Sequence, residues 1–567
     1  MRSLSYINTI DPRFCATTPL TTSSEASTSG VKRKQRDYLD HGDQVVVCDI
    51  CHAKLWKVEA GKGKVYSGRT TYMLCCAYGK LNLPNFKETC LEYQSLFKSL
   101  DDKSKHFILN IRRFNSMFSF TSMGGKVDSK INRGNAPYVY RISGENYHTL
   151  GSLLPKEGGE PKFAQLYIYD TDNEVCNCKT VFSNSNKPAS ATSDLHDTEL
   201  IEYLQVILDS NNQLVKTYRR VRGRFVDNPH VDLKLRLKAN RSKDGRTYNL
   251  PTSSEVAALI VGNIEEALDN RDVVIESKKD GLQRISELHP SYLALQYPLL
   301  FPFGEDGYRV DILHREGRAS TKKKESKCIM REYFAYHVQD RVNHFSLILN
   351  ARRLLQQFLV DVYTMIESER LLFIRLQQKK KKKLRSETYD NLKKLGQNGN
   401  PDMSNVGTRV LLPSSFTGGS RYMRENYYDA MAICKWFGYP DFFITITCNP
   451  KWPENKRFLK DTKINPEDRP DILCRLFKIK LDVIMKDLRE KSLFGNASAV
   501  VYTIEFQKRG LPQAHICLFL NDESKLPSVE HVDNFISAEI PDKNLEPDLY
   551  TLVSDYMIHG PCGLSLP

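Results

Sequence analysis

The residues with the clearest chemical meaning lie in the segment "TIEFQKRGLPQAHICLFL", at 503–520. It reads as a strand, a Gly-Pro turn and a second strand that carries Gln513 and His515. Residues two apart on a strand face the same side, so these two side chains point together, while the even-numbered positions are apolar and should face the core. Glu505 and Gln507 share parity on the first strand, and a suitable register would bring them near His515. An imidazole beside a carboxylate can hold a divalent cation that polarises a phosphate; the alternative is a surface histidine paired with a carboxylate.

A second group of chemically distinctive residues lies near the start, in "VCDICHAKLW" and "YMLCCAYGK". Cys48 and Cys51 form a C-x-x-C pair, and Cys75 and Cys76 form a second pair at a separation within reach of a zinc ribbon. The adjacency of the second pair is unusual, because neighbouring side chains on a strand diverge. His52 is therefore an alternative ligand to either Cys75 or Cys76. Structural zinc is the favoured interpretation, and buried free thiols are the alternative.

Composition sets the broad class of protein. The chain has 567 residues, a formal net charge of +14 and 40% hydrophobic residues, as expected of a folded protein whose partner is a polyanion. No stretch approaches the roughly 18 apolar residues of a membrane span, and the Ser/Thr-rich start lacks a signal core. We therefore expect an intracellular protein with reduced thiols, including Cys176 and Cys178, which have no second pair. "VKRKQR" at 31–36 suggests import into the nucleus.

The elements that must position His515 are readable between 421 and 520. "RYMRENYYDAMAICKWFG" predicts an amphipathic helix that stops at Gly438. "DFFITIT" predicts a strand with Phe443, Thr445 and Thr447 on one face, and "DILCRLFKIKLDVIMKDLRE" predicts a second helix. The two strands around the Gly-Pro turn should then form an antiparallel hairpin. This order is most of a split β-α-β unit of ferredoxin-like type.

The remaining sequence predicts a multidomain α+β protein. β-type runs such as "KFAQLYIYD" precede a predicted helix in "SEVAALIVGNIEEAL", and three prolines prevent "HPSYLALQYPLLFPFGEDGY" from forming one helix. Apolar residues at helical spacing fill 329–376, before a lysine run at 379–383. The expected units are a disordered tail (1–44), a Cys-rich module (45–85), an α+β region (105–315), a helical segment (325–385) and an α+β unit (405–567).

The chain also resembles a known family. "GLPQAH" is similar to the second motif of HUH endonucleases, in which His-apolar-His on a strand binds metal. More specifically, the chain resembles the N-terminal half of Helitron transposon Rep-helicase proteins of plant type. The collinear stretches that carry the resemblance are "CDICHAKLW", "LCCAYGKLNLP", "GSLLP", "PKFAQLYIYD", "HPSYLALQYPLLFPFGEDGY", "LLPSSFTGGSRYMRENYYDAMAICKWFGYPDFFITITCNPKWPE" and "VYTIEFQKRGLPQAHICLFL".

The resemblance implies rolling-circle transposition. A Rep domain of this family, here expected at 405–567, nicks one DNA strand by tyrosine attack on phosphorus, and a fused helicase unwinds the duplex. "FFITIT" then corresponds to the first Rep motif, and His515 to a ligand of Mg²⁺ or Mn²⁺, with Glu505 or Gln507 as a third ligand. The expected α+β and helical segments correspond to the Helitron N-terminal and helicase-like regions.

Two departures from the family argue against activity. Gln513 stands where the family has histidine, and its neutral amide oxygen is a weaker donor than an imidazole nitrogen. The sequence given also stops at Pro567, before the family's nucleophilic tyrosines, so we expect a truncated product. Tyr550 and Tyr556 do not match the nucleophile position and fit better as packing residues. No G-x-x-x-x-G-K-[ST] motif is present, so we expect no ATP binding.

We therefore predict a Helitron helicase-like fragment that is catalytically inactive and at most binds single-stranded DNA in the nucleus. A recruited host DNA-binding or scaffold protein is the alternative, and an active metal-dependent nickase is a weaker one. The oligomeric state stays open. Trp436 is expected to pack in the core. The candidate DNA contacts are Lys508, Arg509 and Arg421 for phosphates, and Trp452 and Tyr439 for base stacking.

Overall fold

The structure, a computed structural model, describes residues 39–61, 63–66, 68–99, 101–132, 138–155, 158–169, 173–182, 191–227, 233–261, 272–276, 282–315, 326–380, 412–460, 464–490, 493–507, 510–525, 528–537 and 539–557. Almost all of the expected N-terminal tail lies outside these residues. So do "VKRKQR", most of the lysine run, Lys508 and Arg509. Among the described residues, no helix is both long and apolar enough to cross a membrane.

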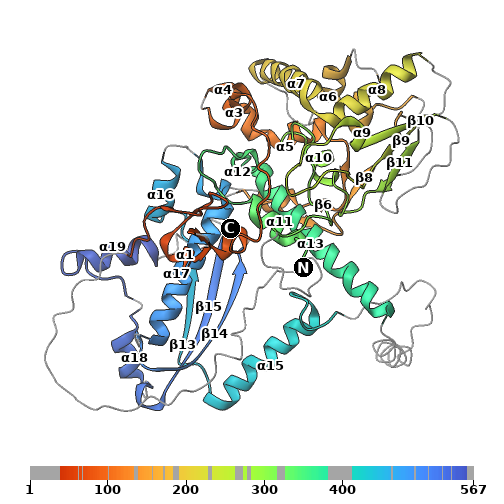
Figure 1. Cartoon of the computed structure of the whole chain (residues 1–567). Helices are drawn as coiled ribbons and strands as arrows, with labels where there is room; N and C mark the ends of the chain where they lie inside the picture. Colours follow the sequence, from red (N-terminus) through yellow and green to blue (C-terminus); the bar gives the residue numbers. More distant parts are fainter. Residues whose placement is uncertain are drawn as a thin grey trace, which may run out of the picture.

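Helices and short antiparallel sheets make up the first two thirds of the chain (Figure 1). Its helices are α1 (Lys57–Ala60), α2 (Met73–Cys76), α3 (Leu91–Lys98), α4 (Asp102–Leu109), α5 (Ile111–Phe118), α6 (Glu174–Phe182), α7 (Ala191–Asn211), α8 (Gln213–Asp227), α9 (Ser253–Val256), α10 (Tyr292–Gln296), α11 (Met330–His337), α12 (Leu347–Asn350) and α13 (Arg353–Lys380), with 3₁₀ turns η2 (Ser129–Asn132) and η3 (Phe163–Tyr167).

The strands of this part form five small sheets. They are β1 (Val46–Val47) with β2 (Lys54–Leu55); β3 (Lys64–Tyr66) with β4 (Arg69–Thr71); β6 (Lys126–Val127) with β7 (Ile142–Ser143); β12 (Gln283–Arg284), β8 (His148–Leu150) and β5 (Ser122–Met123); and β10 (Ala257–Val261), β9 (Leu233–Leu237) and β11 (Val273–Glu276).

One hydrophobic core runs through this whole part, from Cys48 to Met365. The apolar segment "HPSYLALQYPLLFPFGEDGY" lies deep inside it, with only α10 regular, as its prolines predict. The predicted helical stretch 329–376 is confirmed as α11, α12 and α13. A buried hydrogen-bond network connects α13 to β8. Asp361 accepts a hydrogen bond from Tyr297 at 3.0 Å and lies 2.7 Å from the His148 ring nitrogen. The expected unit boundaries along the chain stay predictions.

The last third contains a three-stranded sheet in the order β13-β15-β14, packed against a long helix (Figure 1). Its strands are β13 (Phe442–Thr447), β14 (Ala497–Phe506) and β15 (Pro512–Leu520); its helices and turns are α15 (Ser420–Phe437), α16 (Pro453–Leu459), η6 (Pro466–Asp468), α17 (Pro470–Glu490), η7 (Asp522–Ser524), α18 (Val529–Phe535) and α19 (Pro547–Tyr556).

The strand order confirms the predicted split β-α-β arrangement. β15 pairs antiparallel with both neighbours, so β13 and β14 are parallel, with β15 between them. The even-numbered residues of β15, such as Ala514 and Ile516, are fully buried against Leu476 of α17. Gly438 ends α15 at a φ of 85°, where a side chain would be strained. The helices, strands and hairpin predicted between 421 and 520 are therefore all present.

Two sequence predictions in the first part are wrong. "KFAQLYIYD" forms η3 rather than a strand, because Tyr167 stacks on Phe120 at 4.6 Å and donates a hydrogen bond to the Phe118 carbonyl at 2.7 Å. "SEVAALIV" forms only one helical turn, α9, before continuing as β10. Its run of apolar residues is compatible with both helical and strand periodicity. Pairing with β9 determines that it forms a strand.

The Cys-rich segment joins the two parts of the structure. Trp56 is buried against Ile472 and Ile479 of α17, and its ring lies 5.1 Å from the Arg475 guanidinium. Arg475 also makes a two-pronged ion pair with Glu59 of α1, at 2.6 and 2.7 Å. Both side chains of this pair are nearly buried. Charged groups held together away from water lose much of their hydration and depend on each other, so this pair should hold the two parts together.

We predict that a double-mutant cycle of Glu59→Gln and Arg475→Gln gives a coupling energy of about 1–3 kcal/mol in the free energy of unfolding. Denaturant unfolding of the four proteins measures it. The exposed pair of Lys478 and Asp482 on α17 is the matched control, with an expected coupling below about 0.5 kcal/mol. Equal coupling in both pairs would contradict a structural role for the joint.

Candidate metal centre and polar sheet face

The four cysteines of the two pairs come together at one point. Cys48, Cys51, Cys75 and Cys76 are all buried, and their sulfur atoms lie within 4.8 Å of one another. The Sγ atoms of Cys48 and Cys76 are 3.6 Å apart, and those of Cys75 and Cys76 are 3.8 Å apart. These separations are too long for a disulfide. Four Zn–S bonds of about 2.3 Å in a tetrahedron require sulfurs about 3.8 Å apart, so the cluster fits a zinc ion.

Local backbone geometry explains how an adjacent pair can converge. Cys75 and Cys76 lie on a helical turn, α2, not on a strand, so their side chains diverge far less than those of strand neighbours. Ala77 follows with a left-handed φ of 50° and reverses the chain. This reversal lets the Gly79 N–H donate to Cys76 Sγ at 3.2 Å. The chain also reverses after the first pair of cysteines. His52 has a left-handed φ of 57°, and its N–H donates to the Cys48 carbonyl.

The thiols perturb one another. Hydrogen bonds from Cys51, and then from Cys75 and Cys76, hold the pKa of Cys48 well below its usual value. A thiolate is the form that binds a metal ion. The alternative ligand His52 is exposed and is not part of the cluster. Among the described residues, Cys176 and Cys178 form no disulfide and belong to no group of metal-binding side chains.

The polar face of the β13-β15-β14 sheet brings the four predicted residues of the histidine site together. His515 pairs with Thr445 on one side and Thr503 on the other. Its Nε2 lies 2.8 Å from Glu505 Oε1, and its Nδ1 lies 3.1 Å from Thr445 Oγ1. The ring also stacks on Phe443 at 5.6 Å. Strand alternation already placed Phe443 and Thr445 on this face, although their role in holding the imidazole was not predicted.

The amide side chains of the site hydrogen-bond to each other. Gln507 Nε2 donates to Gln513 Oε1 at 2.7 Å, so the Gln513 oxygen that would meet a cation is already occupied. The face therefore offers one imidazole and one carboxylate, with two neutral amides beside them. In the described part of the chain the four-cysteine cluster is the only group of three or more histidine, cysteine or acidic ligands. The sheet face is thus the weaker of the two candidate metal sites.

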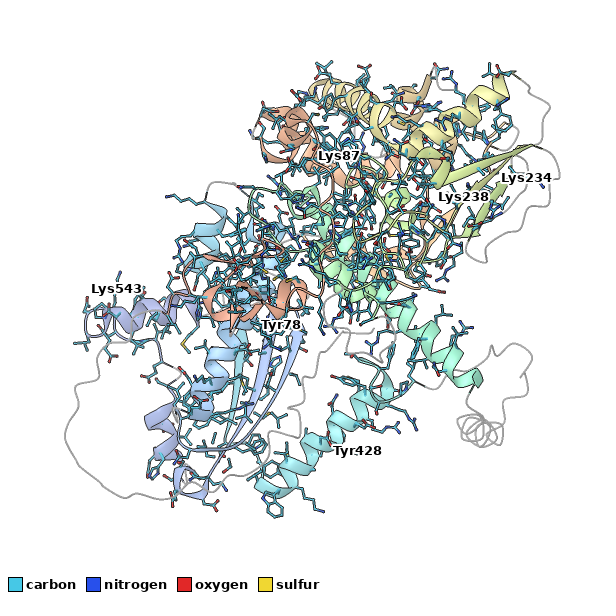
Figure 2. The ribbon with its side chains drawn as sticks, viewed as in Figure 1. Tyr78, Lys87, Lys234, Lys238, Tyr428 and Lys543 are labelled. Atoms are coloured by element: carbon cyan, nitrogen blue, oxygen red, sulfur yellow. The ribbon has the colours of Figure 1, made fainter. Side chains whose placement is uncertain are left out.

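Aromatic residues near this face are placed differently from the sequence predictions. Trp452 is 8% exposed and packs in the core beneath Lys480, so its ring is closed to base stacking. Trp436, expected in the core, is 83% exposed, because α15 is exposed along most of its length and buries only Asn426. Tyr439 is 94% exposed in the loop that enters β13. Figure 2 shows another exposed aromatic, Tyr428, on α15.

The remaining candidates are distributed around the same unit. Arg421 is exposed in the first turn of α15. Lys508 and Arg509, which follow β14 in the sequence, lie outside the described residues. Tyr550 is half-buried on α19, and the Lys543 ammonium lies 5.8 Å from its ring, consistent with a packing role. Tyr556 is the last residue of α19.

We predict that the purified protein contains about one zinc per chain and that Cys48→Ser loses it, because three thiolates no longer close the tetrahedron. Elemental analysis by mass spectrometry measures the content. Cys90→Ser, at an exposed thiol outside the cluster, is the control and should keep the metal. An unchanged zinc content in Cys48→Ser would exclude this site.

We also predict that Gln513→His tightens Mn²⁺ binding by about 10- to 100-fold, because it replaces a neutral amide oxygen with an imidazole nitrogen. Isothermal titration calorimetry measures the affinity. The double variant Gln513→His/His515→Gln, which moves the single histidine along the strand, controls for the added imidazole and should stay weak. Equal affinity in the double and single variants would contradict a two-histidine site.

A comparison with protein families identifies part of this structure. Residues 333–518 match the family described as "Helitron helicase-like domain at N-terminus". The match covers about a third of the 567 residues and runs from α11 to β15, so it includes His515 but not the four cysteines. No curated protein matches the chain. The chain therefore contains a Helitron helicase-like domain, which spans both hydrophobic cores.

Proposed function

We propose that this protein derives from a rolling-circle transposon, that its β13-β15-β14 unit is an HUH/Rep-type domain, and that it binds single-stranded DNA without nicking it. The observation that carries the proposal is the polar sheet face. There His515 lies between the Phe443 ring and the Glu505 carboxylate. Acting on DNA in this way would place the protein in the nucleus.

Exposed aromatic rings support single-stranded DNA as the ligand. Phe443 is 66% exposed on the polar face, and Trp436 and Tyr439 are exposed around the loop that enters the same strand. Unpaired bases stack on such rings at about 1–3 kcal/mol per base, with little dependence on sequence. Arg421, exposed in the first turn of α15, adds a cation for a phosphate. Exposed rings and cations together favour a flexible, base-displaying strand over a paired duplex.

The composition of the metal site supports binding without cleavage. A nicking enzyme needs a cation that stabilises the charge developing on phosphorus. His515 and Glu505 are the strong donors of this face, and the Gln513 oxygen is engaged by Gln507. Loss of even an outer partner of a metal ligand costs about 10- to 100-fold in metal affinity or activity. We therefore propose that Mg²⁺ or Mn²⁺ binds weakly here.

We predict that Trp436→Ala and Tyr439→Ala each weaken binding of a fluorescent single-stranded oligonucleotide by about 5- to 150-fold, the equivalent of one lost stacking contact. Fluorescence anisotropy measures the affinity. Tyr248→Ala removes another exposed ring, from a loop of the first part, and should leave the affinity unchanged.

The same oligonucleotide incubated with Mn²⁺ should remain uncut. Robust cleavage would overturn the non-nicking part of the proposal and favour an active nickase. Unchanged affinity in both aromatic variants would overturn the proposed stacking surface. The two results are independent of each other, because one reports on the metal site and the other on the exposed rings.

A further inference from the structure

A strongly basic helix lies in the first part of the structure, outside the matched domain. α8 carries five cations between its first residues and Arg224, and its first acidic residue is Asp227. Three of them, Lys216, Arg220 and Arg224, recur every four residues and so share one stripe of the helix. Successive members lie about 6 Å apart along the axis.

The stripe has no neutralising partners in the part of the chain that the structure describes. Lys216, Arg220 and Arg224 make no ion pair or hydrogen bond there through their side chains. Like charges four residues apart on a helix repel each other and destabilise it. Asp227 is the only acid within four residues of any of them. The repulsion within the stripe therefore lowers the stability of the helix, and a bound polyanion would relieve it by neutralising the charges.

Open hollows flank the stripe on both sides. One, of about 540 Å³, is lined by Lys216, Arg219, Arg220 and Arg222. Its two acids are already engaged by Arg219, which bonds Glu174 at 2.7 Å and Asp209 at 2.9 Å. The second, of about 460 Å³, is lined by Arg220, Gly223, Arg224 and the serines of α9.

Gly223 lies between two arginines of the helix and has open space around it. A Cβ at this position would meet no heavy atom within 4 Å, so packing does not require glycine. In a helix interior glycine is less favourable than alanine. Because glycine has no side chain, it leaves the helix surface between Arg220 and Arg224 uncovered, and the extended backbone of a ligand can approach closely there.

The surface lacks the aromatic rings that single strands use. Tyr218 of α8 is fully buried, and Phe225 is half-buried against the core. Further cations in this part are Lys234 of β9 and Lys238 directly after it (Figure 2); Lys238 donates to the Ser254 carbonyl at 3.0 Å. Cations spread along about 12 Å of helix fit an extended polyanion better than a compact phosphate. Contacts to phosphates alone carry no sequence information.

We propose that α8 is a second nucleic-acid surface, which binds the phosphate backbone of duplex DNA without base specificity. It lies at the other end of the molecule from the β13-β15-β14 sheet (Figure 1), so one chain can hold a duplex and a single strand at once. The proposal does not depend on the function proposed for the sheet face.

The test measures binding of a random 20-base-pair duplex by anisotropy over a range of salt concentrations. Each phosphate contact contributes about 0.9 to the slope of log K against log salt. Arg220→Gln/Arg224→Gln should therefore lower that slope by about 2 and weaken duplex binding. Lys478→Gln/Lys486→Gln, which removes equal charge from exposed positions of α17, should leave the slope unchanged.

Single-strand binding separates this surface from the sheet face. The α8 double variant should bind the oligonucleotide as the parent does, and Trp436→Ala should bind the duplex as the parent does. An unchanged duplex slope in the α8 variant, or an equal loss in the α17 control, would overturn the proposal. So would a loss of binding to phosphatidylserine vesicles with intact duplex binding, which would assign the stripe to an anionic membrane surface.

Discussion

The four-thiol cluster is the constraint on which the arrangement of the two cores depends. It fixes the chain on either side of α1, and α1 carries Trp56 and Glu59 to the joint with α17. Arg341 anchors the other side of the module, because its buried guanidinium donates to the Cys51 carbonyl at 3.1 Å. Small metal modules with little core of their own take much of their stability from the metal. The cysteine module can therefore fix the position of α17 only while the four-thiol cluster fixes the loops of the module.

α17 transmits that constraint to the sheet because it is packed on two sides. Ile472 and Ile479, seven residues apart and so on one face, contact Trp56. Phe477 and Leu481 lie on the other side and cover the buried face of the sheet. The matched Helitron helicase-like region runs from α11 to β15. The cysteine module packs against two parts of it, the segment around Arg341 and helix α17, although the module lies outside the match.

The sequence predicted the structure correctly where a periodic pattern of apolar residues was compatible with only one type of element. Alternation in β13 and β15, with a glycine stop after α15, was enough to predict the split β-α-β order and the residues sharing a face with His515. The convergence of Cys75 and Cys76 was harder to anticipate, because it depends on a helical turn and on the left-handed Ala77. "SEVAALIV" failed because its pairing partner, β9, is set by tertiary structure. The exposure of Trp436 and the burial of Trp452 depend on tertiary packing, because α15 stays largely exposed while the segment just before α16 packs into the core. Spacing within one element does not predict this.

The two candidate metal sites differ in what the fold requires of them. The even-numbered residues of β15 form the core, and Gln513 and His515 project from the opposite side. Exchange of a histidine for glutamine there weakens a cation site while leaving every core contact in place. The cysteines are fully enclosed, so their loss would disturb the loops that position α1. A fold of this construction can therefore lose cation ligands on the sheet face while keeping its core and the surface rings and cations for which we propose nucleic-acid binding.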